Sequence, residues 1–255
     1  MVEALARLRG RLGAFADNVT WFHEVGSTND VALNFAELGR PEGTVVGSDR
    51  QTAGRGRHGR DWASPAGAGL YISVILRPEA LVAPLLTLAA GVAIADGIRE
   101  ASGLAVSLKW PNDVYVGTRK LAGILAEAGT SGSGLNYVVL GIGINLMSAS
   151  YPPDIVGRAT SVEVELARPV DRGLLLATCL AALVERSRQL ASGSSGTVIT
   201  AWRRYGSDMF GRVVEFTVGS EIVAGIAENV DEHGALLVRT ADRLVPVMSG
   251  QVRWQ

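Results

Sequence analysis

Strand-like and helical patterns alternate along most of this chain, and that alternation limits the folds that it can adopt. Runs of β-branched and aliphatic residues, bounded by glycine, proline or polar turns, lie at 44–50, 69–76, 104–110, 120–127 and 136–147. The two longest helical patterns, at 80–101 and 171–191, are apolar enough to pack on the face of a sheet. We therefore expect one domain in which helices flank a sizeable sheet.

Shorter patterns complete this domain. Residues 1–20 indicate a short helix and a turn, and residues 199–206 are helical in pattern. Ser27 and Thr28 can cap the N-terminus of a helix over 29–39, which ends in a glycine stop.

The pattern of secondary structure in the sequence changes after Gly211. Short strand-like runs follow at 212–218, 221–230, 235–241 and 243–248, separated by turn-forming residues. Short strands at this spacing are typical of a small all-β barrel. We place the boundary near Asp208, which predicts domains at 1–208 and 209–255.

The charge balance argues against a chain whose whole surface attracts nucleic acid. There are 24 Lys and Arg against 25 Asp and Glu, for a formal net charge of -1. Only Lys109 and Lys120 are lysines, so 22 of the 24 basic residues are arginines. A local basic site remains compatible with this composition.

Cysteine usage and hydropathy predict a cytoplasmic chain that does not enter a membrane. Cys179 is the single cysteine, which excludes an intramolecular disulfide, and its apolar helical surroundings predict a buried structural thiol. The N-terminus lacks the apolar core of a signal peptide. The longest apolar stretch, 80–98, is interrupted by Pro84 and Asp96 and therefore predicts a buried helix.

The densest cluster of candidate functional residues lies at 51–62. Arginines at 55, 57 and 60 alternate there with glycines at 54, 56 and 59. Glycine lets backbone amides approach an anion, and arginine offers planar charged donors, so the loop is a candidate anion clamp. Two alternatives remain open: a flexible nucleic-acid-binding segment and a solvated basic turn. The Gly-Lys-Ser/Thr pattern of a phosphate-binding loop is absent.

A second cluster at 109–127 contains both lysines. The lysine ammonium is a compact charge that suits a phosphoryl oxygen, and Asn112 with Asp113 could hold Mg²⁺ or orient a ribose or phosphate. A plain Pro-Asn-Asp turn between strands is the competing interpretation.

Several other kinds of site are not expected. The three histidines, His23, His58 and His233, are scattered and give no zinc spacing. The run GIGIN at 141–145 lacks the third glycine of a dinucleotide fingerprint, and no nucleophile elbow is present. We therefore expect no zinc, no flavin and no NAD.

Five motifs occur in an order that resembles the biotin protein ligases. They are Ser27-Thr28-Asn29, GRGRHGRDW at 54–62, KWPND at 109–113, KLAGIL at 120–125 and GIGIN at 141–145. The resemblance covers nearly the whole chain, including a C-terminal segment similar to that family's SH3-like barrel. It implies an α+β fold, with a mixed sheet flanked by helices as in lipoate ligases and class II aminoacyl-tRNA synthetases.

The resemblance also implies roles for particular residues. Lys120 and Arg57 would be catalytic, beside the reacting carboxylate and the α-phosphate. The biotin site would comprise Ser27, Thr28, Asn29, Gln51, Gly54, Arg55, Gly56, Arg57, Lys120, Gly123, Leu125 and Gly141. The ATP and adenylate site would comprise Arg57, Arg60, Lys109, Asn112, Asp113, Lys120 and the adenine-binding Asn145, with Mg²⁺ near Asn112 and Asp113. Trp62 and Trp110 fit the family pattern, but packing in the core explains them at least equally well.

The activity implied is ATP-dependent biotin ligation. Biotin would be activated to biotinyl-5′-AMP with release of pyrophosphate and then transferred to a lysine of the biotin carboxyl carrier domain of acetyl-CoA carboxylase or a related enzyme. Lipoate ligation and a non-enzymatic anion- or nucleic-acid-binding module are the alternatives. Only about 20 residues precede Trp21, so we expect no operator DNA binding.

Overall fold

A mixed seven-stranded sheet forms the centre of the main domain. The computed structural model describes residues 1–131, 134–148, 155–218, 221–248 and 252–254. The strands lie in the order β1-β2-β3-β7-β6-β5-β4, with only β1 and β2 parallel and the other neighbours antiparallel. Their bounds are β1 (Val19–Val25), β2 (Val45–Gln51), β3 (Gly69–Leu76), β4 (Ser107–Lys109), β5 (Asp113–Val116), β6 (Arg119–Ser131) and β7 (Gly134–Asn145).

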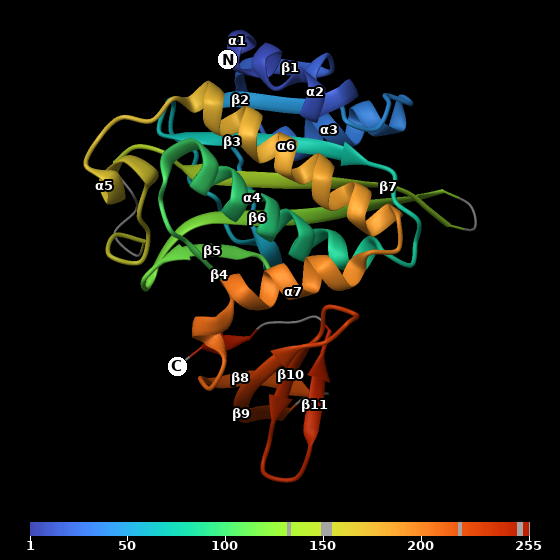
Figure 1. Ribbon diagram of the computed structural model, residues 1–255, viewed down its shortest axis with the longest axis vertical. Coiled ribbons are helices and arrows are strands. Elements are labelled where there is room, and N and C mark those ends of the chain that lie inside the picture. The colour runs from blue at the N-terminus through green and yellow to red at the C-terminus, as the bar shows by residue number, and fades with distance from the viewer. Residues whose placement is uncertain (132–133, 149–154, 219–220, 249–251, 255) are drawn as a thin grey trace.

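Helices cover both faces of this sheet (Figure 1). The α-helices are α1 (Val2–Arg7), α2 (Arg9–Leu12), α3 (Thr28–Glu37), α4 (Leu86–Ser102), α5 (Val162–Leu166), α6 (Arg172–Ala191) and α7 (Ser195–Tyr205). The 3₁₀ turns are η1 (Gly13–Ala16), η2 (Arg57–Gly59), η3 (Ala83–Leu85) and η4 (Ser207–Met209). Helices α4 and α6 pack on one face, and α3 packs against β2, β3 and β7 on the other.

Strand alternation determines which side chains share a face. Directly opposed residues of antiparallel strands point to the same side of a sheet. On the α3 side, the rows of opposed residues are Tyr71, Gly143, Gly123, Asp113 and Lys109; then Ser73, Gly141 and Leu125; then Ile75, Val139 and Glu127. Polar residues and glycines are therefore concentrated on this face, where a pocket can form.

The opposite face is continuously apolar. Ile72, Ile142 and Ile124 form one of its rows, and they belong to the same buried cluster as the apolar residues of α4 and α6. Asp171 caps α6, because its carboxylate accepts from the backbone N–H groups of Gly173 and Leu174 at 2.8 and 3.0 Å. This face supplies most of the core.

The sequence located the larger elements, and the differences have local causes. Helix α4 begins at Leu86 rather than at residue 80, because Pro84 lies in the 3₁₀ turn that precedes it. Strands β1 and β5 were not predicted; β1 is a half-exposed edge strand without clean alternation. Ser27 is the N-cap residue of α3, but its side chain makes no capping hydrogen bond.

A second, antiparallel sheet follows helix α7 and lies below it in Figure 1. Its strands are β8 (Val213–Val218), β9 (Glu221–Val230), β10 (Leu236–Arg239), β11 (Leu244–Val247) and β12 (Arg253–Trp254), in the order β11-β10-β9-β8-β12. This small β domain confirms the predicted fold class. Side-chain hydrogen bonds join it to the main domain: Trp110 Nε1 donates to the Gly234 carbonyl at 3.0 Å, and Arg203 donates to the Val230 carbonyl from Nε at 2.9 Å and from Nη2 at 2.6 Å.

The predicted role of Cys179 as a packing residue is confirmed. The thiol is 1% exposed in the core beside Gly97, and burial raises its pKa above the usual value. Within the part of the chain that the structure describes, no helix has the length and apolar character needed to cross a membrane.

Candidate functional site

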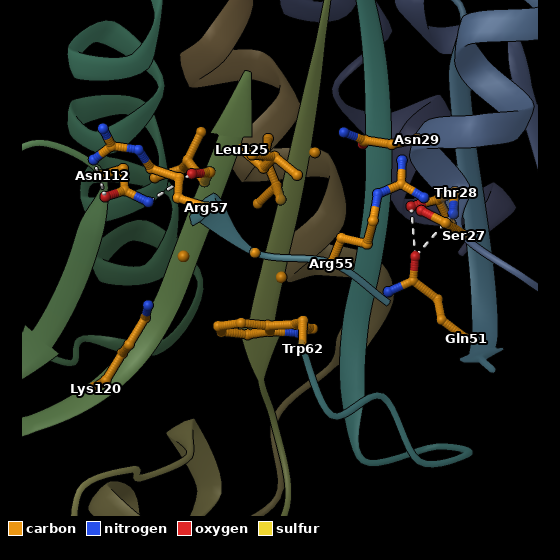
Figure 2. A pocket seen from close by; sticks show the side chains of 16 residues that line it. Ser27, Thr28, Asn29, Gln51, Arg55, Arg57, Trp62, Asn112, Lys120 and Leu125 are labelled. Carbon is orange, nitrogen blue, oxygen red and sulfur yellow. Dashed lines mark hydrogen bonds between the residues drawn. The ribbon is translucent and has the colours of Figure 1, made fainter. Parts of the chain in front are cut away.

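A pocket opens on the α3 side of the sheet, where glycines replace side chains. Its lining residues are Ser27, Thr28, Asn29, Gln51, Arg55, Gly56, Arg57, Trp62, Asn112, Lys120, Gly123, Ile124, Leu125, Gly141, Ile142 and Gly143 (Figure 2). The Trp62 ring lies against the glycine floor, since a Cβ at Gly143 would be 2.5 Å from Trp62 Cε2 and one at Gly123 would be 3.1 Å from Trp62 Cζ3. The glycines therefore make room for this ring and for whatever binds beside it.

One end of the pocket presents neutral hydrogen-bonding groups from Thr28 and Gln51. At the start of α3, the backbone N–H and the hydroxyl of Thr28 both donate to Gln51 Oε1, at 2.8 and 3.0 Å. Gln51 Nε2 donates to Ser64 Oγ at 2.9 Å, which fixes the direction of the amide. Such oriented neutral donors and acceptors select ligands by hydrogen bonding.

A β-bulge brings Lys120 to the pocket. The register of β5 and β6 shifts so that Tyr115 stands opposite Lys120, and Leu121 is the extra residue of β6. Leu121 is fully buried in the core. Strict alternation from Gly123 would have directed Lys120 to the core face, so the bulge is what directs its ammonium to the pocket face.

The Lys120 ammonium lies among three kinds of partner. Its Nζ is 2.6 Å from Asp113 Oδ1 and 5.3 Å from the centre of the Trp62 ring. It is also within 3.3 Å of the position that a Cβ at Gly123 would take. A positive charge at this point can face an anion bound on the glycine floor.

Arg57 supplies a second cation at the same end. Its Nη1 donates to Asn112 Oδ1 at 3.3 Å, while Asn112 Nδ2 donates to the Ile124 carbonyl at 2.8 Å. Burial lowers the pKa of the Arg57 guanidinium below its usual value, and the Asp113 charge partly opposes that shift. The group stays protonated, because a guanidinium is not deprotonated in proteins.

The arginine–glycine loop, residues 54–62, folds as a tight hairpin. The Gly56 N–H donates to the Arg60 carbonyl at 2.7 Å, and the Trp62 N–H donates to the Gly54 carbonyl at 2.9 Å. His58 and Gly59 at its tip have φ angles of 59° and 69°, the left-handed region that favours glycine. The loop thus forms a hairpin over the pocket.

Most of the residues implied by the resemblance line this pocket, and five do not. Gly54 packs against the backbone of the loop, since a Cβ there would be 2.5 Å from the Trp62 carbonyl oxygen. The side chain of Arg60 is exposed to solvent. Asp113 is outside the lining, but its carboxylate pairs with the lining residue Lys120. Asn145 is buried, with Nδ2 donating at 2.9 Å to the carbonyl of Thr160, so it anchors the segment that passes beside Lys120. Its role in binding adenine stays a prediction.

Lys109, the fifth, lies on the same face at the outer edge of the sheet. Its Nζ is 5.0 Å from the centre of the Tyr115 ring and 5.6 Å from that of Trp254, within cation–π range. Burial lowers the pKa of Lys109, and burial also raises the pKa of Tyr115 to about 12. The C-terminal strand β12 thereby contacts the KWPND segment.

The protein alone does not form a Mg²⁺ cage beside Asn112 and Asp113. Mg²⁺ is held by one or two carboxylates together with phosphates and water. Here the Asp113 carboxylate faces Lys120, and Asn112 Oδ1 faces Arg57. Across the described ranges, no group of three His, Cys, Asp or Glu residues could hold a metal ion. A Mg²⁺ ion at this point stays a prediction.

Two cavities of different size meet at Arg57, Ile124 and Leu125. The pocket under the loop measures about 50 Å³, whereas small-molecule sites occupy about 300–1,000 Å³. With the loop in this position, the space under it is smaller than such sites. The adjoining cavity measures about 340 Å³ and extends past Pro84, Leu88 and Trp110 to Gly234 and Met248 of the C-terminal β domain.

Sequence reasoning missed several polar residues around the pocket. Asp30 and Glu127 both pair with Arg55, and Ser73 links Thr28 to Asn29. For Glu127 a signal was available, because alternation along β6 places it on the same face as Gly123 and Leu125. Trp110 is buried as predicted for a core residue, whereas Trp62 lines the pocket.

In comparisons with known proteins, both domains match models of ligase families. Residues 21–145 match the biotin/lipoate A/B protein ligase family, and residues 209–252 match the biotin protein ligase C terminal domain. The bifunctional ligase/repressor BirA of Bacillus subtilis is 33% identical over 240 residues, covering 91% of this chain and 72% of that protein. The biotin–[acetyl-CoA-carboxylase] ligase of Mycobacterium tuberculosis is 35% identical over 237 residues, covering 90% of this chain and 86% of that protein.

Solved structures agree with the sequence matches. The biotin protein ligase from Aquifex aeolicus in complex with biotin and ATP has a TM-score of 0.81 at 29% identity, covering 93% of this chain and 98% of that chain. The Leishmania major enzyme in complex with biotinyl-5-AMP has a TM-score of 0.65 at 25% identity, with the same coverage. The matched regions include strands of both sheets.

Proposed function

This chain belongs to the biotin/lipoate A/B protein ligase family, and on that premise we propose that its pocket activates biotin with ATP and passes it to a carrier protein. In the first reaction the biotin carboxylate attacks the α-phosphorus of ATP, biotinyl-5′-AMP forms and pyrophosphate leaves. In the second, a lysine amine of the acceptor attacks the carbonyl carbon, an amide bond forms, and AMP and a proton leave. Relatives named as biotin–[acetyl-CoA-carboxylase] ligases support this assignment.

One observation carries the proposal: a hydrogen-bonding end and a cationic end lie on opposite sides of a single pocket (Figure 2). At the first end Thr28 and Gln51 present neutral groups and the charge of Arg55 is paired with Asp30, whereas Lys120 and Arg57 lie at the other. Biotin has the same polarity, with an uncharged ureido ring, an apolar chain and a carboxylate. The ureido group binds at Thr28 and Gln51, and the chain lies over the wall that contains Leu125.

Lys120 and Arg57 bring two anions together. The biotin carboxylate and the α-phosphate repel each other, and an effective dielectric of about 20 gives about 4 kcal/mol for two unit charges 4 Å apart. The ammonium and the guanidinium offset this repulsion, since each charge-assisted hydrogen bond contributes about 1.5–3 kcal/mol. Holding the reactants in line lowers the barrier by a further amount, on the order of 7–11 kcal/mol for well-oriented groups.

The arginine–glycine loop protects the product. Biotinyl-5′-AMP is a mixed anhydride that water or any free amine can destroy, so a closed roof excludes both. The acceptor lysine reaches the carbonyl carbon from the adjoining cavity, whose walls include Leu88, Trp110 and Met248. This route lets the amine arrive while the loop stays over the adenylate.

Pyrophosphate exchange into ATP tests the proposal, because exchange requires a reversible adenylation. We expect labelled pyrophosphate to enter ATP only when biotin and Mg²⁺ are present. Exchange that depends on lipoate would reassign the chain to lipoate ligation. No exchange with either acid would favour a non-enzymatic anion-binding module.

We further propose a biotin carboxyl carrier domain as the acceptor, a cytoplasmic location and no binding of operator DNA. The free thiol Cys179 supports a reducing compartment.

The net charge of -1 supplies no general attraction for DNA. A gel-shift experiment at physiological salt should show no sequence-specific complex; a specific complex would contradict this part of the proposal.

A further inference from the structure

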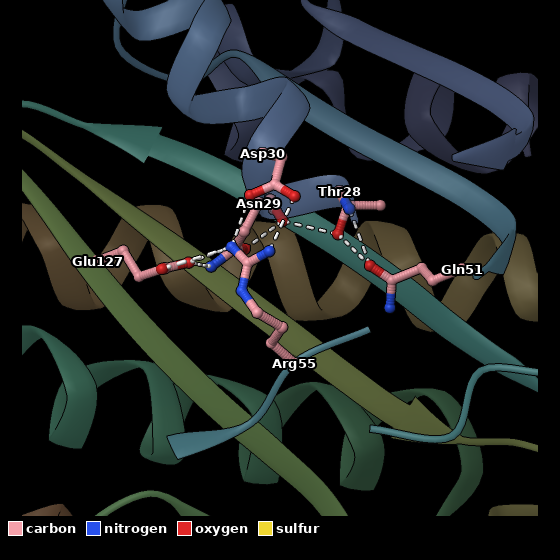
Figure 3. A network of polar contacts seen from close by, with 7 residues as sticks. Thr28, Asn29, Asp30, Gln51, Arg55 and Glu127 are labelled. Atoms are coloured by element: carbon pink, nitrogen blue, oxygen red, sulfur yellow. Dashed lines mark hydrogen bonds and ion pairs between the residues drawn. The ribbon is translucent and has the colours of Figure 1, made fainter. Parts of the chain in front are cut away.

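Glu127 joins two parts of the pocket that are far apart in sequence (Figure 3). It follows Leu125 by two residues on β6, and its side chain is 31% exposed. Its Oε2 accepts from Asn29 Nδ2 at 2.5 Å and lies 3.4 Å from Arg55 Nη2. One carboxylate therefore contacts both the start of α3 and the arginine–glycine loop.

The carboxylate determines which way the Asn29 amide points. An ionised carboxylate only accepts hydrogen bonds, so the Asn29 NH₂ group must face Glu127 and its carbonyl must face away. Asn29 Oδ1 accordingly lies 2.5 Å from Ser73 Oγ, whose hydroxyl can donate to it. A Cβ at Gly141 would be 2.3 Å from the same oxygen and 2.9 Å from Asn29 Cγ, so only glycine leaves room for the Asn29 side chain here.

The oriented amide continues into the polar end of the pocket. Ser73 Oγ is 2.8 Å from Thr28 Oγ1, and Thr28 Oγ1 is 3.0 Å from Gln51 Oε1. Polar contacts thus run from Glu127 through Asn29, Ser73 and Thr28 to Gln51; the single proton of the Ser73 hydroxyl serves either Asn29 Oδ1 or Thr28 Oγ1 at one time. Glu127 is the only carboxylate among these residues. Because a carboxylate only accepts hydrogen bonds, it fixes the direction in which the neighbouring Asn29 amide donates.

The second partner of Glu127 belongs to the loop. Arg55 makes a bidentate contact with the Asp30 carboxylate, at 2.8 Å from Nη1 and 2.6 Å from Nη2. Its Nη2 also faces Glu127. The hydrogen bond from Arg55 lowers the pKa of Asp30 below its ordinary value. Asp30 is 55% exposed, so Glu127 is the inner of the two carboxylates that hold Arg55.

We propose that Glu127 is a positioning residue for the biotin site. Its carboxylate orients the Asn29 amide and attracts Arg55, so closure of the arginine–glycine loop and ordering of the biotin-recognising side chains occur together. This inference rests on the proposed function. It assigns a role to a residue that contacts neither the floor nor the cationic end of the pocket.

The test compares binding of biotin and of ATP by calorimetry in wild type, Glu127→Gln and Glu127→Ala. We expect the dissociation constant for biotin to rise about tenfold in each, the scale of one charge-assisted hydrogen bond, while that for ATP changes less than about twofold. Glu228→Gln is the matched control: Glu228 is 36% exposed on β9 and pairs with Arg239 far from the pocket. It should leave both constants unchanged.

Each contrary result has a distinct meaning. Wild-type biotin affinity in both Glu127 variants would overturn the inference, and so would an equal loss of biotin and ATP binding with a lower Tm, which indicates a general structural role. Absence of biotin binding by the wild-type protein would instead contradict the proposed function.

Asp30→Asn separates the two halves of the inference. This change weakens the contact of Arg55 with α3 but leaves the bond between Glu127 and Asn29. We expect faster tryptic cleavage in the loop, read by mass spectrometry, with a smaller loss of biotin affinity than in Glu127→Ala. An equal loss of biotin affinity in the two variants would show that loop closure alone accounts for the effect, and the proposed orientation of Asn29 would be wrong.

Discussion

Lys120→Ala is expected to lower the rate of biotinyl-5′-AMP formation by about two to three orders of magnitude, the scale of losing one preorganised electrostatic group. Lys120 lines the pocket, and under the proposed function its Nζ atom lies where the carboxylate and the α-phosphate meet. Without it, Asp113, whose carboxylate lies 2.6 Å from Nζ, adds an unpaired negative charge beside two other anions. The loss should appear mainly in the rate of the chemical step, measured by biotin-dependent pyrophosphate exchange.

Arg119→Ala is the matched control for this change. Arg119 is the preceding residue on β6, and it also pairs with a carboxylate, at 2.7 Å from Glu165 Oε1. Removing it deletes a cation and an ion pair of similar length outside the pocket lining, so exchange should stay near the wild-type rate. Near-normal exchange in a folded Lys120→Ala protein would remove the proposed catalytic role of Lys120.

Gly123→Val should raise KM for biotin by about tenfold to hundredfold, because inserting methyl groups into a packed site costs about 1–3 kcal/mol. A Cβ at Gly123 would lie 3.1 Å from Trp62 Cζ3 and 3.3 Å from Lys120 Nζ. The two methyl groups of valine would occupy the space between these groups, which the proposed function assigns to the carboxylate end of biotin. Steady-state exchange at varied biotin concentration measures the change.

The strand itself should tolerate valine, which favours extended backbone. Gly134→Val serves as the control, since Gly134 begins β7 and a Cβ there meets no atom within 4 Å. Its KM for biotin and its Tm should match wild type. An unchanged KM in Gly123→Val would mean that biotin does not lie on the glycine floor between Trp62 and Lys120.

The motifs predicted the members of the pocket better than their arrangement. Thr28, Gln51, Arg57 and Lys120 come from four separate segments, and all four line it. The motifs did not indicate which residues line the pocket and which support it: Asn145 is buried and its amide donates to the Thr160 carbonyl, while its role in binding adenine stays a prediction. A motif specifies only the residue type at a position. It does not distinguish an asparagine that contacts a ligand from one that donates to a backbone carbonyl.

The sequence by itself determined strand β6 and the shared face of Gly123, Leu125 and Glu127, because side-chain alternation is a local property of extended backbone. Only the tertiary structure decided that Lys120 joins that face, since the bulge at Leu121 exists through the register that β6 forms with β5. It likewise decided the partners of Glu127, which lie 72 and 98 residues away in Arg55 and Asn29. Such contacts depend on how the helix, the loop and the strand pack together, and no local pattern encodes that packing.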